Sequence, residues 1–348
     1  MVCNEVRKDY LLNRWVVIAT ERSRRPTDFI KAKHHHVKEI LCPLCVGNED
    51  LTPPAVLLYL NENGKITKTE DNLKQRKKNW LIRIVPNLYP AFNDYENTNC
   101  NKKSNFSSNL INAIGHHEVI VESPKHNEDP SRAKIEQLIN LINAYIDRLV
   151  ILSSKPYVKF VSIFRNYGRE AGASLTHAHS QIVAMPFVPI ILREEIDACQ
   201  KFYNKNKKCI FCDIIKKETK GPRLIFQNDC FIVFAPFASI QPLEFWIIPK
   251  RHDNTIINLT KHEIKIFAQT LKKSLTALKL LVNDPPYNFG FHLSLNKKNK
   301  KFYHWHLEVY PKLSIWAGFE KNTGVYINTL PPEKAVLELR KIIKNNSL

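Results

Sequence analysis

The sequence predicts an α+β fold in which an antiparallel sheet is covered by a few long helices and the arrangement is built twice along the chain. The predicted strands occur in pairs around single long helices, which is typical of antiparallel sheet and not of alternating parallel units. The same motifs occur twice in the same order. The chain has 348 residues, enough for two domains of ordinary size. We therefore expect domains at residues 1–196 and 197–348.

The repeat is defined by a Cys-X-X-Cys pair, a strand that ends at a Pro and a His, a long helix, a further strand and a His-X-His motif. The first half has Cys42, Cys45, His126, His177 and His179, and the second half has Cys209, Cys212, His252, His304 and His306. The spacing agrees, since 51 residues separate His126 from His177 and 52 separate His252 from His304. An internal duplication is the simplest explanation of this pattern.

Three long helices are predicted from the spacing of apolar residues and from capping signals. Apolar side chains recur at helical intervals over residues 135–149 and 264–282. Asp129-Pro130 has the composition of an N-cap followed by the first helical residue. Residues 260–263 form a Thr-X-X-Glu capping box, and a third helix is expected over residues 331–342.

Strands are predicted where short runs are rich in β-branched and aromatic residues. Two of these runs, at residues 117–122 and 244–249, precede the long helices. The other predicted strands are Val158–Arg165, Gln181–Met185, Phe231–Ala235, Phe289–Leu293 and Leu307–Tyr310.

The composition excludes several classes of protein. An apolar fraction of 44% and a charged fraction of 24% are those of a globular chain, so extensive disorder is not expected. No apolar run approaches the length of a membrane span, and the charged N-terminus has no signal peptide pattern, so we expect a cytoplasmic protein that does not bind membranes. Neither GxGxxG nor GxxxxGK[ST] occurs, which argues against dinucleotide-binding Rossmann and P-loop folds.

The net charge favours anionic partners. Lys and Arg number 52 against 33 Asp and Glu, a formal charge of +19. Phosphates, nucleotides or nucleic acid are therefore candidate ligands. Much of the excess is Lys beside Asn, which is also the composition of an ordinary solvated surface.

The paired cysteines indicate metal sites. Two residues between cysteines allow both thiolates to bind one tetrahedral metal, although the same spacing also suits thioredoxin-like redox chemistry. We favour zinc because polar loop sequence follows Cys45, where a redox pair would begin a helix. One predicted ligand set is Cys42, Cys45, His126 and His177. The other is Cys209, Cys212, His252 and His304, with His292 and His306 as competing ligands.

The His-X-His-X-Gln motif at residues 177–181 is the strongest indication of catalysis. In an extended segment His177, His179 and Gln181 point to the same face. A neutral imidazole can attack phosphorus if an acceptor holds its other ring nitrogen, and an amide nearby can donate to the phosphoryl oxygens. One histidine would be the nucleophile and its neighbour a metal ligand or a support. The alternative is a structural pair of histidines.

Two further segments have the residue types of phosphate sites. Gly168 and Gly172 lie in the loop that follows the strand at residues 158–165, and glycine lets backbone amides approach a phosphate closely. This loop is otherwise a turn between strands. Arg22, Arg24 and Arg25 near the N-terminus could pair with phosphates, or they could be a surface charge run.

Taken together, these motifs resemble the galactose-1-phosphate uridylyltransferase family, a duplicated branch of the histidine-triad superfamily. The resemblance covers nearly the whole chain. It is carried by Asn13-Arg14-Trp15-Val16, Arg24-Arg25-Pro26, Cys42-Pro43-Leu44-Cys45, Pro86-Asn87-Leu88-Tyr89-Pro90, Ser123-Pro124-Lys125-His126, residues 166–181 and Ala317-Gly318-Phe319-Glu320. It implies two histidine-triad-like half-barrel domains, each an antiparallel sheet with helices, in a homodimer with two structural zinc sites, the second of which can instead hold iron.

The resemblance also assigns residues. It implies that His179 is the nucleophile and that Gln181 contacts the nucleotidyl phosphoryl group. The implied substrate-binding residues are Arg22 and Arg25 for the nucleotide, Asn87 near the nucleoside, Asn166, Gly168 and Ser174 for phosphate, and Phe319 and Glu320 for the hexose of the partner subunit's site. Glu308 occupies the position equivalent to Gln181 in the second half, so we expect that half to keep metal binding without catalysis.

The implied reaction is ping-pong transfer of a uridylyl group from UDP-glucose to galactose 1-phosphate through His179. Some segments are similar instead to the plant branch of the family, in which an adenylyl group passes from ADP-glucose to phosphate. A third hypothesis is a zinc-stabilised, non-catalytic protein that binds nucleic acid, suggested by the charge of +19. We do not expect it, because it gives the His-X-His-X-Gln motif no role.

Overall fold

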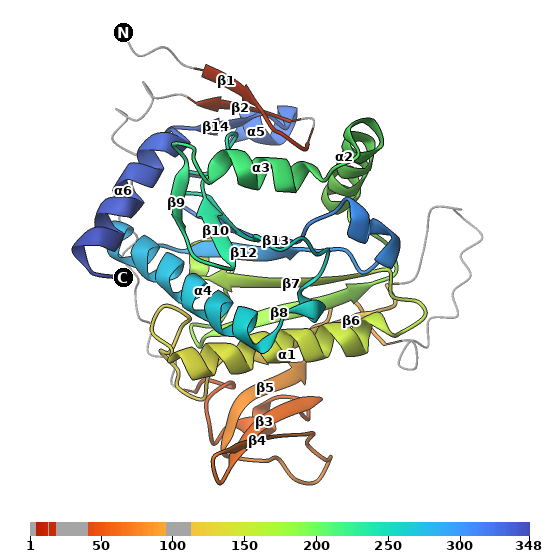
Figure 1. The fold of residues 1–348 in the computed structure, drawn as a ribbon. Coiled ribbons are helices and arrows are strands. Elements are labelled where there is room, and N and C mark those ends of the chain that lie inside the picture. The colour runs from red at the N-terminus through yellow and green to blue at the C-terminus, as the bar shows by residue number, and fades with distance from the viewer. Residues whose placement is uncertain (1–4, 13, 19–40, 95–112) are drawn as a thin grey trace.

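The computed structural model describes residues 5–12, 14–18, 41–94 and 113–348, and its main feature is one sheet of eleven strands. The spatial order of its strands is β4-β3-β5-β6-β8-β7-β12-β13-β11-β10-β9, and every neighbouring pair is antiparallel. A separate sheet of three strands has the order β1-β2-β14. The predicted α+β class with antiparallel sheet is confirmed (Figure 1).

The element bounds agree with most of the predicted ones to within a few residues. The strands of the large sheet are β3 (Leu57–Glu62), β4 (Lys65–Thr69), β5 (Trp80–Pro86), β6 (His116–Val121), β7 (Phe160–Tyr167), β8 (His179–Met185), β9 (Leu224–Gln227), β10 (Phe231–Phe234), β11 (Phe245–Pro249), β12 (Tyr287–His292) and β13 (His306–Pro311). Those of the small sheet are β1 (Glu5–Lys8), β2 (Trp15–Ile18) and β14 (Tyr326–Asn328). The helices are α1 (Ile135–Ser153), α2 (Ile190–Asn206), α3 (Ile210–Glu218), α4 (Lys261–Val282), α5 (Gly318–Thr323) and α6 (Pro332–Asn345).

The two halves of the chain join within the large sheet, where β7 pairs with β12. Asn166 lies opposite Asn288 in this pair. Moving outwards from the junction, β7, β8 and β6 follow on one side and β12, β13 and β11 on the other. The two His-X-His motifs therefore begin equivalent strands on either side of the junction. The predicted domain boundary at residues 196 and 197 falls inside α2 and stays a prediction.

The helices divide the large sheet into two different faces. The apolar faces of α1 and α4 pack together and against one side of the sheet, so Ile182 and Ala184 of β8 are buried in the same core as the two helices (Figure 1). Val183 and Met185 point to the other side, where they contact a second core that includes Leu192 of α2. Because side chains alternate along a strand, the odd-numbered residues of β8 all lie on this second side.

One capping prediction is confirmed and one is wrong. Thr260 caps α4, and its hydroxyl accepts from the Glu263 backbone N–H while the Glu263 carboxylate accepts from the Thr260 N–H. Asp129 does not cap α1, which begins at Ile135. Its carboxylate instead accepts from the backbone N–H of Ser131 at 2.8 Å, so Asp129-Pro130 closes a turn ahead of the helix.

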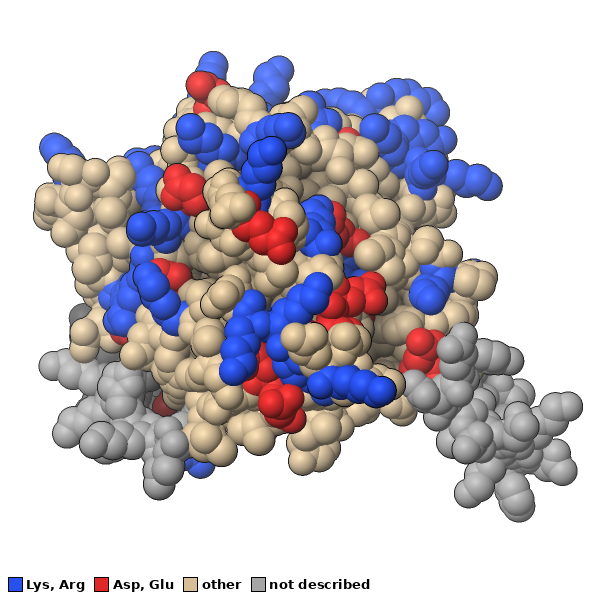
Figure 2. Space-filling model, turned by 90° about the horizontal axis from the view of Figure 1, so that it is seen from below, with Lys and Arg blue, Asp and Glu red and all other residues tan. Residues whose placement is uncertain are grey.

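Basic and acidic side chains are mixed on one face of the molecule. Figure 2 shows Lys and Arg interspersed with Asp and Glu on the face seen there, and no continuous basic groove runs across the described residues of this face. The distribution on this face gives no support to the nucleic-acid hypothesis. Among the described residues, no helix combines the length and the apolar character needed to cross a bilayer.

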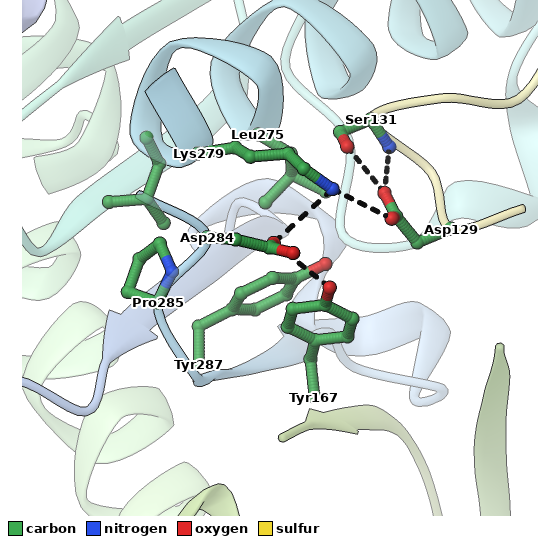
Figure 3. Close-up of a pocket in the computed structure, with 9 residues that line it drawn as sticks. Asp129, Ser131, Tyr167, Leu275, Lys279, Asp284, Pro285 and Tyr287 are labelled. Atoms are coloured by element: carbon green, nitrogen blue, oxygen red, sulfur yellow. Dashed lines mark hydrogen bonds and ion pairs between the residues drawn. The ribbon is translucent and has the colours of Figure 1, made fainter. Parts of the chain in front are cut away.

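A small cavity at the junction of the halves is lined by paired polar groups. The Lys279 ammonium lies 3.1 Å from the Asp129 carboxylate and 3.2 Å from that of Asp284, and the Tyr167 hydroxyl donates to Asp284 at 2.9 Å (Figure 3). Asp129 and Tyr167 come from the first half, whereas Lys279 and Asp284 come from the second. The ion pairs and the hydrogen bond around this cavity connect the two halves on the side of the sheet that the long helices cover.

Candidate active site

His179 is held in one tautomer at the start of β8. Its ring is buried, with 6% of the residue exposed, and its Nδ1 lies 2.7 Å from the backbone carbonyl oxygen of His177. A carbonyl oxygen only accepts, so Nδ1 carries the proton and donates it. Nε2 is then left with a lone pair. Burial lowers the pKa of His179, and the nearby charge of Arg165 acts in the same direction, so the ring is kept neutral.

Gln181 lies on the same face as His179, two residues along β8. Its Oε1 is 2.7 Å from Nε2 of His117, which comes from the neighbouring strand β6. Asn87 approaches the same histidine, since its Nδ2 lies 3.1 Å from His117 Nε2. The structure therefore brings two predicted site residues, Gln181 and Asn87, together around a third side chain that the sequence did not mark as functional.

The loop after β7 lies at the end of the sheet where His179 begins β8. The register between β7 and β8 pairs Phe164 with Gln181. If the same register is extended by two residues, Asn166 lies opposite His179. Gly168 and Gly172 have φ values of 83° and 89°, a backbone conformation that favours glycine. Both glycines are therefore needed by the turn itself, which begins close to the position opposite His179.

Asn288 of β12 fixes this loop and was not predicted. Its side-chain Nδ2 donates to Asn166 Oδ1 at 2.8 Å and to the carbonyl oxygen of Ala171 at 2.7 Å. The interaction leaves the amide end of Asn166 as a donor. A signal was present in the sequence, because Asn-Tyr-Gly at residues 166–168 recurs as Asn-Phe-Gly at residues 288–290.

Three further predicted site residues, Ser174, Phe319 and Glu320, lie in the part of the chain that the structure describes. Ser174 is exposed at the end of the loop. Phe319, which is 48% exposed, and Glu320 lie on α5, which packs against β14 of the small sheet and lies away from β8 (Figure 1). The Glu320 carboxylate accepts from the Ala317 backbone N–H and so caps that helix. Arg22 and Arg25 lie outside the described residues.

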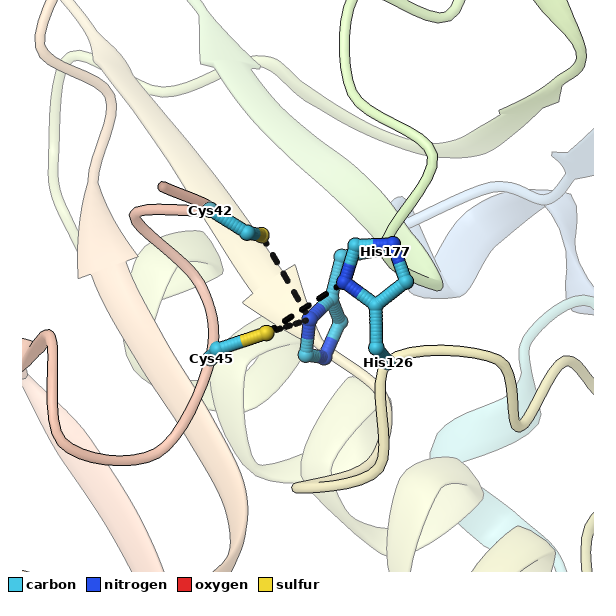
Figure 4. Close-up of side chains that lie close together, drawn as sticks. All are labelled: Cys42, Cys45, His126 and His177. Carbon is cyan, nitrogen blue, oxygen red and sulfur yellow. Dashed lines mark hydrogen bonds between the residues drawn. The ribbon is translucent and has the colours of Figure 1, made fainter. Parts of the chain in front are cut away.

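The first predicted metal-ligand set converges. Cys42, Cys45, His126 and His177 each offer a ligand atom, and these atoms all lie within 4.8 Å of one another (Figure 4). Cys45 Sγ is 3.3 Å from His126 Nδ1 and 3.4 Å from His177 Nδ1. A tetrahedral zinc with ordinary bond lengths would separate S and N ligands by about 3.5 Å, so the spacing fits.

The remaining ring nitrogens of this set have the partners that metal ligands require. His177 Nε2 donates to the Ser123 carbonyl oxygen at 2.8 Å, and His126 Nε2 lies 2.9 Å from the Thr176 hydroxyl. Such bonds fix the ring so that Nδ1 faces the metal. Burial lowers the pKa of His177 to about 4, so its ring is neutral and able to bind. The donor set and its supports therefore fit a structural zinc.

The second predicted set has the same construction. Cys209, Cys212, His252 and His304 also place their ligand atoms within 4.8 Å of one another. His304 Nε2 donates to the Pro249 carbonyl oxygen at 2.8 Å, as His177 does to Ser123. The hydrogen bond from Cys209 lowers the pKa of the Cys212 thiol, and a thiolate is the form that binds a cation. This set also fits zinc.

A third cluster lies beside the second His-X-His motif. Glu195 of α2, His292 of β12, and His306 and Glu308 of β13 place one atom each within 4.8 Å of the others. Their ring nitrogens and carboxylates are already paired, for example His292 Nδ1 with Glu195 at 3.0 Å. Burial would lower the pKa of His292, but the charges of Glu308 and Glu195 raise it to about 9. The cluster is therefore a buried network of ion pairs. With a cation present, the same groups could serve as ligands. The sequence indicated His292 and His306 only as competitors for the second set.

A buried ion pair lies near His179, on the helix-covered face of the sheet. The Arg165 guanidinium donates to the Glu122 carboxylate at 3.0 Å and to the Tyr287 hydroxyl at 2.9 Å. Next to it, the hydroxyls of Tyr145 and Ser180 are 2.8 Å apart. Tyr287 and Arg165 come from opposite halves, so this network also joins the repeats beneath the site.

The family assignment follows from comparisons with known proteins. A sequence profile described as the N-terminal domain of galactose-1-phosphate uridyl transferase matches residues 2–189, and one described as a domain of unknown function (DUF4921) matches residues 115–346. ADP-glucose phosphorylase of Arabidopsis thaliana is 31% identical over 97% of this chain and 93% of its own length. Galactose-1-phosphate uridylyltransferase of Thermotoga maritima is 30% identical over 97% and 98%.

Solved structures agree. A crystal structure of an ADP-glucose phosphorylase from Arabidopsis thaliana with bound ADP-glucose has a TM-score of 0.80 and 30% identity, covering 97% of this chain and 99% of that one. A uridylyltransferase structure has a TM-score of 0.74 and 27% identity, covering 99% of each chain. The Thermotoga maritima relative and the second structure are named uridylyltransferases, and the likeness of all these proteins spans both halves of the fold. The chain belongs to the galactose-1-phosphate uridylyltransferase family and is a nucleotidyltransferase.

Proposed function

We propose that this protein transfers a uridylyl group from UDP-glucose to a hexose 1-phosphate, with galactose 1-phosphate as the leading acceptor, through a covalent nucleotidyl-His179. One observation carries the proposal. The His179 ring donates through Nδ1 to the His177 carbonyl oxygen at 2.7 Å, which leaves the Nε2 lone pair as nucleophile beside Gln181. A neutral and oriented imidazole is what attack on phosphorus requires.

The reaction has two half-steps that use the same phosphorus. In the first, His179 Nε2 forms a bond to the α-phosphorus of UDP-glucose, while the bond to the bridging oxygen breaks and glucose 1-phosphate leaves. In the second, a phosphate oxygen of galactose 1-phosphate bonds to that phosphorus and the N–P bond breaks, which gives UDP-galactose and free His179. The proton stays on His179 Nδ1 throughout and is donated to the His177 carbonyl oxygen.

Donor groups around His179 would stabilise the charge on the phosphoryl oxygens. Gln181 and Asn166 can each offer a side-chain amide, and the turn at Gly168 offers backbone N–H groups. Little covalent work remains for the protein beyond positioning these donors. Ser174 at the end of the same loop is proposed to contact the departing sugar phosphate, and Asn87 to lie near the nucleoside.

Zinc is proposed to bind the two Cys2His2 sets and to act structurally. Four protein ligands close the coordination sphere, so zinc there supplies rigidity and no open position for substrate. In the first set, Cys42 and Cys45 would hold the His177 backbone in place. That backbone includes the carbonyl oxygen that orients His179, so the metal site and the nucleophile share one residue.

A second candidate function is supported by a specific likeness. The chain is 31% identical to an ADP-glucose phosphorylase and resembles the structure of such an enzyme with a TM-score of 0.80. In that case His179 would take the adenylyl group of ADP-glucose and pass it to inorganic phosphate. The chemistry at His179 is the same, and only the base and the acceptor differ.

We also propose a homodimer in which Phe319 and Glu320 complete the acceptor site of the partner. Both residues lie on α5, away from β8, and Phe319 is exposed, which is consistent with a role outside their own chain's site. Mixing inactive His179→Asn protein with an inactive Phe319→Ala protein tests this. Regain of about a quarter of the activity is expected after subunit exchange, since half the dimers would be mixed and each would hold one intact site. No regain would contradict a shared site.

The experiment for the reaction itself is isotope exchange. UDP-glucose is incubated with labelled glucose 1-phosphate in the absence of any acceptor, and ADP-glucose is treated in parallel. Label entering UDP-glucose is expected, because a ping-pong enzyme reverses its first half-step without the second substrate. Label entering ADP-glucose alone would select the second candidate. Exchange with neither would contradict the covalent mechanism.

A further inference from the structure

His117 and Gln181 form a side-chain pair beside the nucleophile, on adjacent strands of the same face. His117 Nε2 lies 2.7 Å from Gln181 Oε1. The preceding residue, His116, points to the opposite face of β6 and contacts the Tyr157 hydroxyl at 2.8 Å. Two consecutive histidines therefore face opposite sides of one strand, and only His117 faces the site.

The backbone decides which nitrogen of His117 carries the proton. The N–H of Ala91 lies 3.1 Å from His117 Nδ1 and can only donate, so Nδ1 is the acceptor in the neutral ring. The proton is therefore on Nε2, from which it is donated to Gln181 Oε1. Asn87 Nδ2 lies 3.1 Å from the same nitrogen, and its own Oδ1 accepts from the Tyr89 N–H, so Asn87 packs against Nε2 without receiving its proton.

This bond fixes the orientation of the Gln181 amide. A glutamine side chain has an accepting oxygen and a donating NH2 group, and a rotation by half a turn exchanges them. Only the NH2 group can stabilise the charge that develops on phosphoryl oxygens. With Oε1 held by His117, the NH2 group is the end that remains for the substrate. Without His117, the amide could present either end.

We propose that His117 is a positioning residue for nucleotidyl transfer, acting through Gln181. The inference rests on the proposed function of His179. The chain of bonds runs from the Ala91 N–H through the His117 ring to the Gln181 amide and ends at the phosphoryl group. The backbone N–H of Asn87 also donates to the His117 carbonyl oxygen at 2.8 Å. His117 thus connects the segment of residues 87–91 to the amide that donates to the phosphoryl oxygens.

A double-mutant cycle tests this role. The rate of nucleotidyl-enzyme formation and its substrate dependence are measured with UDP-glucose and with ADP-glucose for wild type, His117→Leu, Gln181→Leu and the double variant. His117→Leu is expected to slow formation about 10- to 100-fold with less than about a threefold change in the half-saturating concentration, because an amide in the wrong orientation mainly destabilises the transition state. In the Gln181→Leu background the same change should cost less than about threefold.

Two matched variants separate positioning from folding. His116→Leu makes the same change one residue away on the opposite face and is expected to keep the rate within about twofold. His117→Gln keeps an N–H donor near the position of Nε2 and is expected to recover part of the rate that His117→Leu loses. Independent, additive losses from His117→Leu and Gln181→Leu would overturn the proposal, as would a wild-type rate in His117→Leu. A wild-type enzyme that forms no adduct with either nucleotide sugar would instead overturn the proposed function on which it rests.

Discussion

The Nδ1 atom of His179 lies 2.7 Å from the backbone carbonyl oxygen of His177, a residue whose own Nδ1 faces two cysteine thiols. One short segment therefore joins a metal-ligand set to the proposed nucleophile. The side chain of His177 belongs to the metal set, while its carbonyl oxygen sets the tautomer of His179. We therefore expect the orientation of His179 to depend on the loop that carries the cysteines.

The first prediction concerns which nitrogen of His179 becomes modified. Because Nδ1 donates to the His177 carbonyl oxygen, the nucleotidyl group should form its bond at Nε2. The adduct is prepared with histidine labelled in both ring nitrogens, kept at alkaline pH, and examined by NMR for phosphorus coupling. Coupling to Nε2 is expected, and coupling to Nδ1 would mean that the observed tautomer is not the reactive one.

The second prediction separates the two metal sets. Cys42→Ser should lose one equivalent of bound zinc and should also slow adduct formation, because the segment that orients His179 is released. Cys209→Ser should lose one equivalent and stability, yet form the adduct at a rate close to wild type. Metal content by mass spectrometry and adduct rate are measured on the same samples. Unchanged metal content in Cys42→Ser would remove the first ligand assignment.

The third prediction tests the buried pair of Arg165 and Glu122. Removing one partner leaves an uncompensated charge in the core, so Arg165→Met should lower the free energy of unfolding by about 3–5 kcal/mol. The double variant Arg165→Met/Glu122→Leu should be more stable than Arg165→Met alone, since no charge is left unpaired. Denaturant titration measures all of these. A double variant as unstable as the sum of the two single changes would show that the pair does not act as a unit.

The fourth prediction concerns pH and Glu263, the partner of Thr260 in the capping box of α4. Hydrogen bonds from Arg251 lower the pKa of Glu263 to about 2, below its ordinary value of 4.5. A group whose pKa is lowered by folding stabilises the protein fully above its unfolded pKa, and this contribution is lost as the pH falls toward the folded pKa. Glu263→Gln should therefore cost about 1 kcal/mol at pH 7 and progressively less below about pH 4.5.

Denaturant titrations of wild type and Glu263→Gln across this pH range give the difference directly. Effects of acid on the metal ligands are common to both proteins and cancel in it. A difference that stays constant from pH 7 to pH 3 would contradict the assignment of the lowered pKa to Glu263.

The sequence was sufficient where the signal was local and repeated. The His-X-His-X-Gln pattern with alternation along a strand placed His179 and Gln181 on one face, and the structure has them there. Both Cys2His2 sets followed from the repeat and are brought together as expected. Such motifs can be predicted because metal binding and strand alternation each require particular residue types at short, fixed spacings.

Other features depend on tertiary contacts that no local pattern encodes. His117 contacts Gln181 from a neighbouring strand, so this pair appears only once the strand order is known. The repeat of Asn-Tyr-Gly as Asn-Phe-Gly points to Asn288, but its bond to Asn166 also depends on the pairing of β7 with β12. Asp129 was predicted to be a helix cap, but its carboxylate accepts a hydrogen bond within a turn and forms an ion pair with Lys279 from the other half. Glu195 lies in α2, which was not predicted, and reaches His292 only through packing of that helix on the sheet.

Intact-protein mass measured after incubation with UDP-glucose or ADP-glucose at neutral to alkaline pH, without acceptor, tests the central role of His179 most directly. The wild type should gain the mass of a single nucleoside monophosphate group, and His179→Asn should gain none while keeping its fold and metal content. His306→Asn, the matched change in the second His-X-His motif, should still form the adduct. Modification of the His179→Asn protein, or no modification of wild type with either nucleotide sugar, would contradict the covalent mechanism.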